Sequence, residues 1–285
     1  MPKTIIISDL DGTLLDSTDY SFAAARPALA RIRAQDVPLV LCSSKTRAEM
    51  EVYRRRLDNG HPFITENGGG VFIPKGYFSD PATSGESGDY RLITLGRPYA
   101  EIRSRFVRLR DQLGSQVRGF ADMSVAEVVA LTGLTSSEAA LARQRDFDEV
   151  FIFDGQPDER FLRAIEVSGL RWTQGQFFHI MGDHDKGRAV KLLQALYQRE
   201  YGEITCIGLG DSLNDLPLLE TVDQPVLVPH ADGSFEARIK FAGLQKARHP
   251  GPLGWNEAVL RLLAASTGAS GNATAPTAGM AGALP

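Results

Sequence analysis

Short apolar runs alternate with helix-length amphipathic segments in the first and last thirds of the chain. The apolar runs, rich in Val, Ile and Leu, lie at residues 4–7, 37–42, 63–65, 204–209 and 225–228. Apolar positions recur at helical spacing in segments 23–34, 46–57, 186–201 and 255–265. Strands buried on both faces and separated by helices indicate a parallel sheet with right-handed crossovers. We therefore predict one α/β domain built from two separated parts of the chain, residues 1–79 and 183–265.

The middle of the chain follows a different pattern. Small polar residues at 79–89 predict a loop. Beyond this loop, strands and helices are mixed. We expect strands at 91–96, 116–123, 149–153, 171–173 and 177–181, and helices at 98–113, 125–131, 136–145 and 157–167. This order indicates an α+β domain, residues 80–182, inserted into the first domain. Residues 266–285 contain no charged side chain and are rich in Ala, Gly, Thr and Ser, which predicts a disordered tail.

Composition narrows the classes of protein to consider. The 285 residues are 43% hydrophobic and carry a formal net charge of -4, so no overall basic field attracts nucleic acid or an anionic membrane. Cys42 and Cys206 each lie in an apolar run, which predicts buried, reduced thiols. No apolar run approaches the length of about 18 residues that a membrane span needs, and the first strand begins too early for a secretory signal. We expect a cytoplasmic protein without nucleic-acid or membrane partners.

Polar, chemically useful side chains stand where the predicted strands end. Asp9 and Asp11 follow the first strand, Ser43 follows the second, Asp211 and Asp215 follow the strand at 204–209, and Lys186 begins a helix. Each has an ordinary explanation as a turn residue, a helix cap or a surface charge. The carboxyl ends of parallel strands meet at one sheet edge, however, and together these groups form a set suited to phosphoryl transfer. Carboxylates suit Mg²⁺, whereas a hydroxyl and an ammonium suit phosphoryl oxygens.

Two motifs place the chain in a known superfamily. Residues 9–13, Asp-Leu-Asp-Gly-Thr, resemble the DxDGT motif of the haloacid dehalogenase (HAD) superfamily, and residues 210–215 resemble its GDxxxD motif. The resemblance implies a HAD-like Rossmannoid parallel sheet core with an inserted α+β cap. It also implies that Asp9 is the nucleophile that forms an aspartyl-phosphate and that Asp11 is the general acid and base. Ser43 and Lys186 would then hold the phosphoryl oxygens, and the ligands of Mg²⁺ would be Asp9, the backbone carbonyl of Asp11, and Asp211, with Asp215 in support.

A narrower resemblance covers residues 3–265. Residues 43–49, Ser-Ser-Lys-Thr-Arg-Ala-Glu, are similar to a signature of mannosyl-3-phosphoglycerate phosphatases, as are the segments 65–69, 95–99, 145–149 and 177–182. The resemblance implies a small phosphorylated sugar acid as substrate. The substrate-binding residues predicted from it are Gly12, Ser44, Lys45, Asn67, Gly68, Arg143, Arg145 and Asn214. The chain departs from the family pattern at Gln176, where an arginine is common, and at Val150, where a proline is common.

Alternative functions remain open at this point. A general sugar phosphatase or a sugar phosphomutase shares the first and last motifs, and a phosphate-ester binding protein could retain the fold. Asp11 argues against the binding protein and against an ATPase, because only an alkoxide leaving group needs a proton from an acid at this position. His179 lies in an apolar run and is expected to be a structural histidine.

Overall fold

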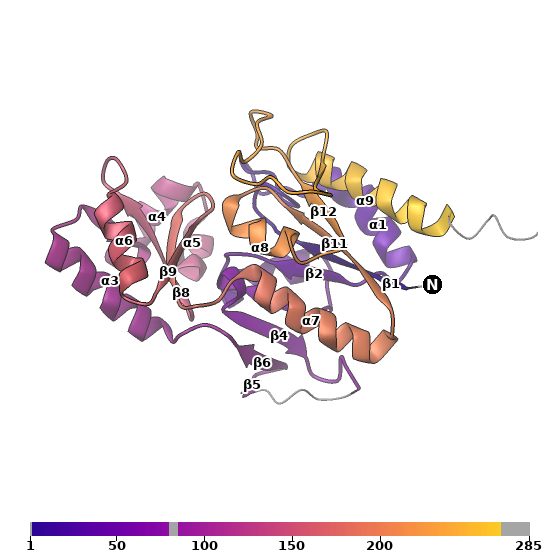
Figure 1. Ribbon diagram of the computed structural model, residues 1–285, viewed down its shortest axis with the longest axis horizontal. Helices are drawn as coiled ribbons and strands as arrows, with labels where there is room; N and C mark the ends of the chain where they lie inside the picture. Colours follow the sequence, from indigo (N-terminus) through magenta and orange to yellow (C-terminus); the bar gives the residue numbers. More distant parts are fainter. Residues whose placement is uncertain (1, 80–84, 269–285) are drawn as a thin grey trace, which may run out of the picture.

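The computed structural model describes residues 2–79 and 85–268 and contains a large and a small β-sheet (Figure 1). The large sheet holds nine strands, in the order β13 (Gln245–Lys246), β12 (Gln224–Leu227), β11 (Ile204–Gly210), β1 (Lys3–Ser8), β2 (Leu39–Cys42), β3 (Phe63–Thr65), β4 (Gly70–Pro74), β6 (Tyr90–Thr94) and β5 (Gly85–Ser87). The strands from β13 to β3 pair in parallel, and the last three are antiparallel to their neighbours. The predicted parallel-dominated α/β fold is confirmed.

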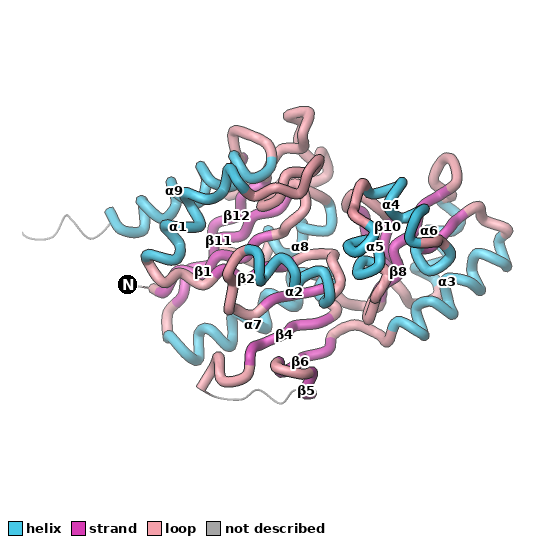
Figure 2. The backbone as a smooth tube through the Cα atoms, turned by 180° about the vertical axis from the view of Figure 1, so that it is seen from behind, coloured by secondary structure: helices cyan, strands magenta, loops and turns pink. Residues whose placement is uncertain are grey.

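Helices cover both faces of the large sheet, as the two opposite views show (Figures 1 and 2). One face packs against α1 (Arg26–Ala34), α2 (Arg47–Arg56) and α9 (Gly251–Gly268), and the other against α7 (Lys186–Tyr201) and α8 (Leu216–Leu219). Successive side chains of a strand point to opposite faces. Accordingly, Ile6 of β1 joins the first apolar layer, whereas Ile5 and Ile7 join the second. Burial on both faces explains why the strand sequences are continuously apolar.

The small sheet is antiparallel and lies beside the large one (Figure 1). Its four strands are β7 (Val117–Gly119), β8 (Asp148–Phe153), β10 (Phe178–Met181) and β9 (Arg171–Gln174). One face packs against α3 (Tyr99–Leu113) and α6 (Glu159–Val167), and the other against α4 (Val125–Thr132) and α5 (Ser136–Ala142). We call the small sheet with these four helices the cap, and the large sheet with its helices the core.

The segment after the predicted loop adds two strands to the large sheet. Strand β6 pairs antiparallel with β4, with Leu92 opposite Phe72, and β5 pairs with β6. Leu92 and Ile93 pack against the two apolar layers of the large sheet, which accounts for this pairing. Residues 80–84 lie outside the described residues. The domain boundaries remain a prediction, and these contacts favour a cap that begins after Thr94.

Three other expectations can be compared with the structure. Helix α9 continues to Gly268, past the predicted start of the tail at 266, and residues 269–285 lie outside the described residues. Cys42 and Cys206 are free and buried, as predicted. Among the helices described, none is by itself both long and apolar enough to cross a membrane; α4 and α5 satisfy that test only as a pair, which is bent by 102°.

Candidate active site

Three buried carboxylates meet at the edge of the large sheet. Asp9 directly follows β1, Asp211 directly follows β11, and Asp215 ends the short 3-10 helix Leu213–Asp215. Because β1 and β11 are parallel neighbours, their carboxyl ends lie side by side. Each carboxylate offers an oxygen atom, and these atoms lie within 4.8 Å of one another. Hard oxygen donors that repel one another at this distance fit a Mg²⁺ ion.

Lys186 balances part of this negative charge. It begins α7 and is fully buried, and its Nζ donates hydrogen bonds of 2.6 Å to Oδ1 of Asp9 and 2.6 Å to Oδ1 of Asp215. Burial opposes the charge of Lys186, but Asp215 and Asp9 outweigh it and raise the pKa of the ammonium. Burial and the charge of Asp215 raise the pKa of Asp9 well above its usual range, although Lys186 opposes them. One ammonium therefore offsets only part of the charge of the cluster.

Hydrogen bonds orient the other two carboxylates. Asp211 accepts bonds from Oγ1 of Thr13 at 3.0 Å and from Oγ of Ser212 at 2.8 Å. Asp215 accepts the backbone N–H groups of Asp211 and Ser212 at 3.0 and 3.1 Å on its Oδ2. Burial, followed by the charge of Asp215, raises the pKa of Asp211 to about 7. Since both oxygens of Asp215 already have partners, its geometry suits the supporting role predicted for it.

The glycine after Asp11 is required by the closeness of Asp211. Gly12 has φ +74°, a conformation that side chains rarely adopt, and a Cβ placed on it would lie 2.7 Å from Oδ2 of Asp211. Any larger residue would displace a carboxylate of the acidic cluster. Gly12 also lies on the wall of the cavity described below.

Asp11 pairs with Lys45. The Nζ of Lys45 lies 2.9 Å from Oδ2 of Asp11 and 3.8 Å from Oε1 of Glu49, close to the rings of Tyr20 and Tyr53. Burial disfavours the charge of Lys45, but Asp11 and Glu49 outweigh it and raise its pKa. Oδ1 of Asp11 is buried and has no hydrogen-bond partner within the described part of the chain. The predicted substrate ligand Lys45 is thus engaged by the predicted general acid.

A cavity of about 550 Å³ lies between the edge of the large sheet and the cap. Residues of both parts line it, and the predicted site residues on its wall are Asp9, Asp11, Gly12, Ser44, Lys45, Arg145, Asp211 and Asn214. The other predicted residues, which do not form its wall, are Ser43, Asn67, Gly68, Arg143, Lys186 and Asp215. The structure therefore gathers Asp9, Asp11 and Asp211, which are predicted to act in catalysis or metal binding, around one space together with part of the cap.

Ser43 lies directly behind this wall. It follows β2 and is fully buried, and its Oγ accepts the backbone N–H of Lys45 at 3.2 Å. Its carbonyl accepts the backbone N–H of Asn67 at 3.1 Å. The hydroxyl proton remains available for an acceptor such as a phosphoryl oxygen. Its neighbour Ser44 reaches the wall itself.

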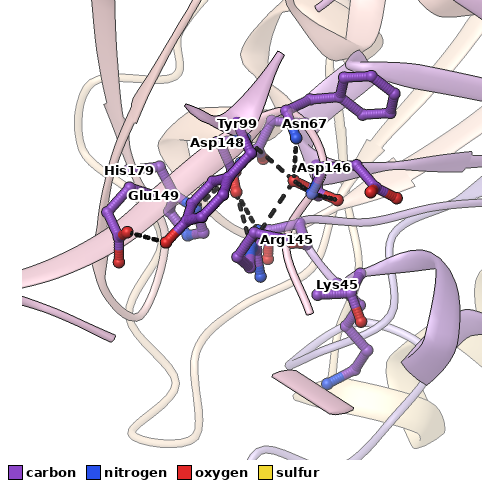
Figure 3. A network of polar contacts seen from close by, with 12 residues as sticks. Lys45, Asn67, Tyr99, Arg145, Asp146, Asp148, Glu149 and His179 are labelled. Carbon is purple, nitrogen blue, oxygen red and sulfur yellow. Dashed lines mark hydrogen bonds and ion pairs between the residues drawn. The ribbon is translucent and has the colours of Figure 1, made fainter. Parts of the chain in front are cut away.

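Arg145 and Arg143, both predicted to bind substrate, differ in position. Arg145 is buried on the cavity wall, where its Nε donates to Oδ1 of Asp148 at 2.8 Å and its Nη2 donates to the carbonyl of Ser44 at 2.8 Å (Figure 3). Arg143 instead donates its Nε–H to the carbonyl of Phe120 at 3.2 Å and does not line the cavity. The geometry therefore favours Arg145 as a ligand for the substrate. It does not favour Arg143, and substrate binding by Arg143 is left out of the proposed function.

Asp148 connects Arg145 with a second set of polar groups (Figure 3). Its Oδ2 accepts Nδ2–H of Asn67 at 3.1 Å and lies 2.9 Å from Nδ1 of His179. Burial alone would raise the pKa of Asp148, but the charge of Arg145, aided by His179, holds it well below the usual range. Asn214 then donates to Oδ1 of Asn67 at 3.0 Å. Asn67 is therefore a link between core and cap rather than a wall residue, and His179 has the buried, bonded environment expected of it.

Gly68 serves the backbone rather than the cavity. It has φ +98°, and a Cβ on it would lie 2.2 Å from the carbonyl oxygen of Asp185, the residue that caps α7. Gly68 thus packs closely against the turn that positions Lys186, and its contact with substrate stays a prediction.

Several wall residues were not predicted. The loop after β12 contributes His230, Glu236 and Arg238, and Nε2 of His230 lies 3.1 Å from the carbonyl oxygen of Asp211. Tyr20, Gln174 and Phe177 also line the cavity. No motif marks the first five of these positions, whereas Phe177 begins the family-like segment 177–182. The predicted strand at 225–228 could have indicated the loop that follows it as part of the site. The carboxyl end of this strand lies at the same sheet edge as that of its parallel neighbour β11.

Comparison with known proteins agrees with this geometry. Residues 6–80 match the family model described as haloacid dehalogenase-like hydrolase. A glucosyl-3-phosphoglycerate/mannosyl-3-phosphoglycerate phosphatase from Methanococcoides burtonii is 43% identical over 265 residues, which are 92% of this chain and 97% of that protein. A protein of the same name from Persephonella marina is 43% identical over 263 residues, 91% of this chain and 97% of its own. A solved structure from Thermoplasma acidophilum aligns with this chain at a TM-score of 0.67 and 17% identity, and the alignment covers 92% of this chain and 99% of the other. This similarity supports the fold alone.

The fold, the acidic cluster at the sheet edge and these relatives define a hydrolase of the haloacid dehalogenase class. Within that class, the chain belongs to the family of glucosyl-3-phosphoglycerate/mannosyl-3-phosphoglycerate phosphatases.

Proposed function

We propose that this protein is a Mg²⁺-dependent phosphatase that hydrolyses the phosphate ester of mannosyl-3-phosphoglycerate or of a closely related glycosyl-3-phosphoglycerate. The observation that carries the proposal is the placement of Asp9 and Asp11 on one cavity wall with the buried guanidinium of Arg145. The first two groups suit phosphoryl transfer, and the third suits an organic acid. The names of the two relatives that are 43% identical support the same substrate class.

Asp9 is the proposed nucleophile. One of its oxygens attacks phosphorus while the bond from phosphorus to the ester oxygen breaks, which leaves an aspartyl-phosphate and an alkoxide. Asp11 gives that alkoxide a proton, and its ionised carboxylate then takes a proton from the water that attacks phosphorus. The bond between phosphorus and the Asp9 oxygen breaks in this second step, which restores the Asp9 carboxylate. Lys186 supports this role because its 2.6 Å hydrogen bond fixes Oδ1 of Asp9. The products are inorganic phosphate and the free hydroxyl compound.

Groups around Asp9 and Asp11 would act on the phosphoryl group and the cation. Ser43 and Lys186 hold and neutralise phosphoryl oxygens, and the proposed ligands of Mg²⁺ are Asp9, the backbone carbonyl of Asp11, and Asp211. The bound ion would supply positive charge next to the oxygens that become more negative in the transition state. Asp215 supports the cluster through its bonds to Lys186 and to two backbone N–H groups.

The cap would recognise the rest of the substrate. Arg145 is the proposed partner of the glycerate carboxylate, since a guanidinium forms directional, charge-assisted bonds with carboxylates. Gln176, which replaces the arginine common in the family, also lines the cavity and offers a neutral amide there. The sugar would then be held by neutral polar and aromatic groups of this wall.

Phosphate release from a panel of esters tests the proposal. We expect mannosyl- or glucosyl-3-phosphoglycerate to be hydrolysed with a higher kcat/KM than simple hexose phosphates. Equal rates on all esters would instead favour a general sugar phosphatase, and a rearranged sugar phosphate without inorganic phosphate would identify a phosphomutase. Asp9→Asn should abolish turnover but retain substrate binding, and unchanged turnover in that variant would contradict the mechanism.

A further inference from the structure

One cap segment, residues 145–148, inserts into the core at the end of β3. The carboxylate of Glu66 accepts three successive backbone N–H groups from it, those of Asp146 at 2.9 Å, Phe147 at 2.7 Å and Asp148 at 3.0 Å. Glu66 is fully buried and adopts φ +46°, a rare value for a residue with a side chain. Successive N–H groups that converge on one carboxylate form an anion-binding concavity of the backbone. The cap thus wraps part of its own backbone around a core side chain.

The aromatic ring of this segment occupies a socket made by glycines. A Cβ on Gly69 would lie 2.4 Å from Cβ of Phe147, one on Gly70 would lie 2.7 Å from its Cε2, and one on Gly96 would lie 2.7 Å from its Cβ. Real Cβ atoms essentially never approach so closely, so these three positions exclude any larger residue while Phe147 is present. Gly69 and Gly70 border β4 and Gly96 follows β6, and the carbonyl of Gly69 accepts the N–H of Gly96 at 2.9 Å. Phe147 is buried in this socket.

The residues on either side of Phe147 connect this anchor to the cavity. Arg145 crosses from cap to core, since its Nη2 donates to the carbonyl of Ser44, while Asp148 holds its Nε (Figure 3). Nε of Arg145 also lies 3.7 Å from Oε2 of Glu66. Within the described residues, Arg145 uses Nε and Nη2 for its hydrogen bonds and Nη1 for none, so Nη1 remains available to a ligand. The direction of the guanidinium therefore depends on how the segment 145–148 is seated.

We propose that Glu66 and Phe147 are positioning residues that anchor this cap segment to the core and thereby hold Arg145 ready at the substrate cavity. This inference rests on the proposed function, because it takes Arg145 to bind the carboxylate of the substrate. A carboxylate buried away from water is costly unless its hydrogen bonds are made, so lifting the segment off Glu66 is opposed by the loss of three of them. A binding group fixed in advance loses less conformational entropy when substrate arrives. Any movement of the cap relative to the core would then leave residues 145–148 in place.

Glu66→Gln and Phe147→Ala test the proposal, with Arg56→Gln as the matched control. Arg56 forms another ion pair between core and cap, with its Nη2 3.0 Å from Oε1 of Glu138, and its side chain is exposed. The first measurement is hydrogen exchange at the amides of residues 146–148. We expect exchange there to be at least about tenfold faster in the two anchor variants and unchanged in the control. Unchanged exchange in both anchor variants would contradict the proposal that Glu66 and Phe147 anchor residues 145–148 to the core.

The second measurement compares two substrates. Both anchor variants should raise KM for mannosyl-3-phosphoglycerate by about tenfold or more, with little change in KM for para-nitrophenyl phosphate, which has no carboxylate. Phe147→Leu, which refills much of the socket, should restore part of the affinity. Equal losses on both substrates would overturn the positioning role even if exchange is faster. If the wild-type protein hydrolyses neither ester, the proposed function fails, and the exchange measurement still decides whether the anchor exists.

Discussion

The ammonium group of Lys45 lies 2.9 Å from Oδ2 of Asp11. Oδ1 of the same carboxylate is buried and has no hydrogen-bond partner among the described residues. Both residues line the wall of the cavity. A proton donor must be held within hydrogen-bond reach of the leaving oxygen. Lys45 is therefore in a position to align the proposed general acid, in addition to any contact with substrate.

Replacing Lys45 should slow the reaction most for esters with poor leaving groups. In Lys45→Met, Asp11 loses its partner, and we expect kcat for a sugar phosphate to fall by about 100-fold, in the range of general acid catalysis. The loss for para-nitrophenyl phosphate should be much smaller, because nitrophenolate leaves without a proton. Asp11→Asn should show the same selectivity. Equal losses on both substrates in both variants would contradict this role for the pair.

Gly12→Ala should disturb the acidic cluster in addition to lowering the free energy of unfolding through backbone strain. The new Cβ would lie 2.7 Å from Oδ2 of Asp211, whereas at Gly76, with a similar φ of +77°, a Cβ would meet nothing within 4 Å. Both variants should lose about 1–2 kcal/mol of unfolding free energy from the unfavourable backbone conformation. Only Gly12→Ala should also weaken Mg²⁺ binding, which calorimetric titration would measure. Equal Mg²⁺ affinities in the two variants would be evidence against Asp211 as a ligand.

The affinity for Mg²⁺ should depend on pH near neutrality. Burial and Asp215 raise the pKa of Asp211 to about 7, so below that pH the carboxyl group is protonated in the metal-free protein. A cation must displace this proton, and binding is therefore weaker at lower pH. We expect the apparent affinity to fall about tenfold between pH 8 and pH 6. Titrations in buffers of different ionisation enthalpy would detect the released proton, and a flat profile would contradict the prediction.

Removing the ammonium of Lys186 should destabilise the core and abolish activity. Lys186→Met leaves Asp9 and Asp215 buried without their shared partner. Breaking a buried ion pair by removing one member costs about 3–5 kcal/mol, which denaturant unfolding would measure in the absence of metal. Excess Mg²⁺ should recover part of this loss, because a cation replaces some of the missing positive charge. A variant as stable as the wild type would show that the carboxylates are neutral in the folded protein.

Much of the acidic cluster followed from the sequence because it is a property of strand ends. Asp9 follows β1 and Asp211 follows β11, and the parallel pairing of these strands brings the two carboxylates together without any further information. Helix α7 has the bounds 186–201 that its apolar spacing predicted, so Lys186 was placed correctly at its start. Gly12 was recognisable as a turn residue for the same local reason.

Tertiary structure decided which partner each remaining side chain has. Lys45 pairs with Asp11, Glu66 holds the backbone of residues 146–148, and Arg145 rather than Arg143 reaches the cavity. These contacts join segments about 30 to 80 positions apart in the chain, so neither helical nor strand periodicity contains them. Residue type and spacing determine local conformation and the sheet edge at which a side chain emerges. The direction in which a long charged side chain then points depends on the charges and cavities that other segments bring to it, and these exist only in the folded molecule.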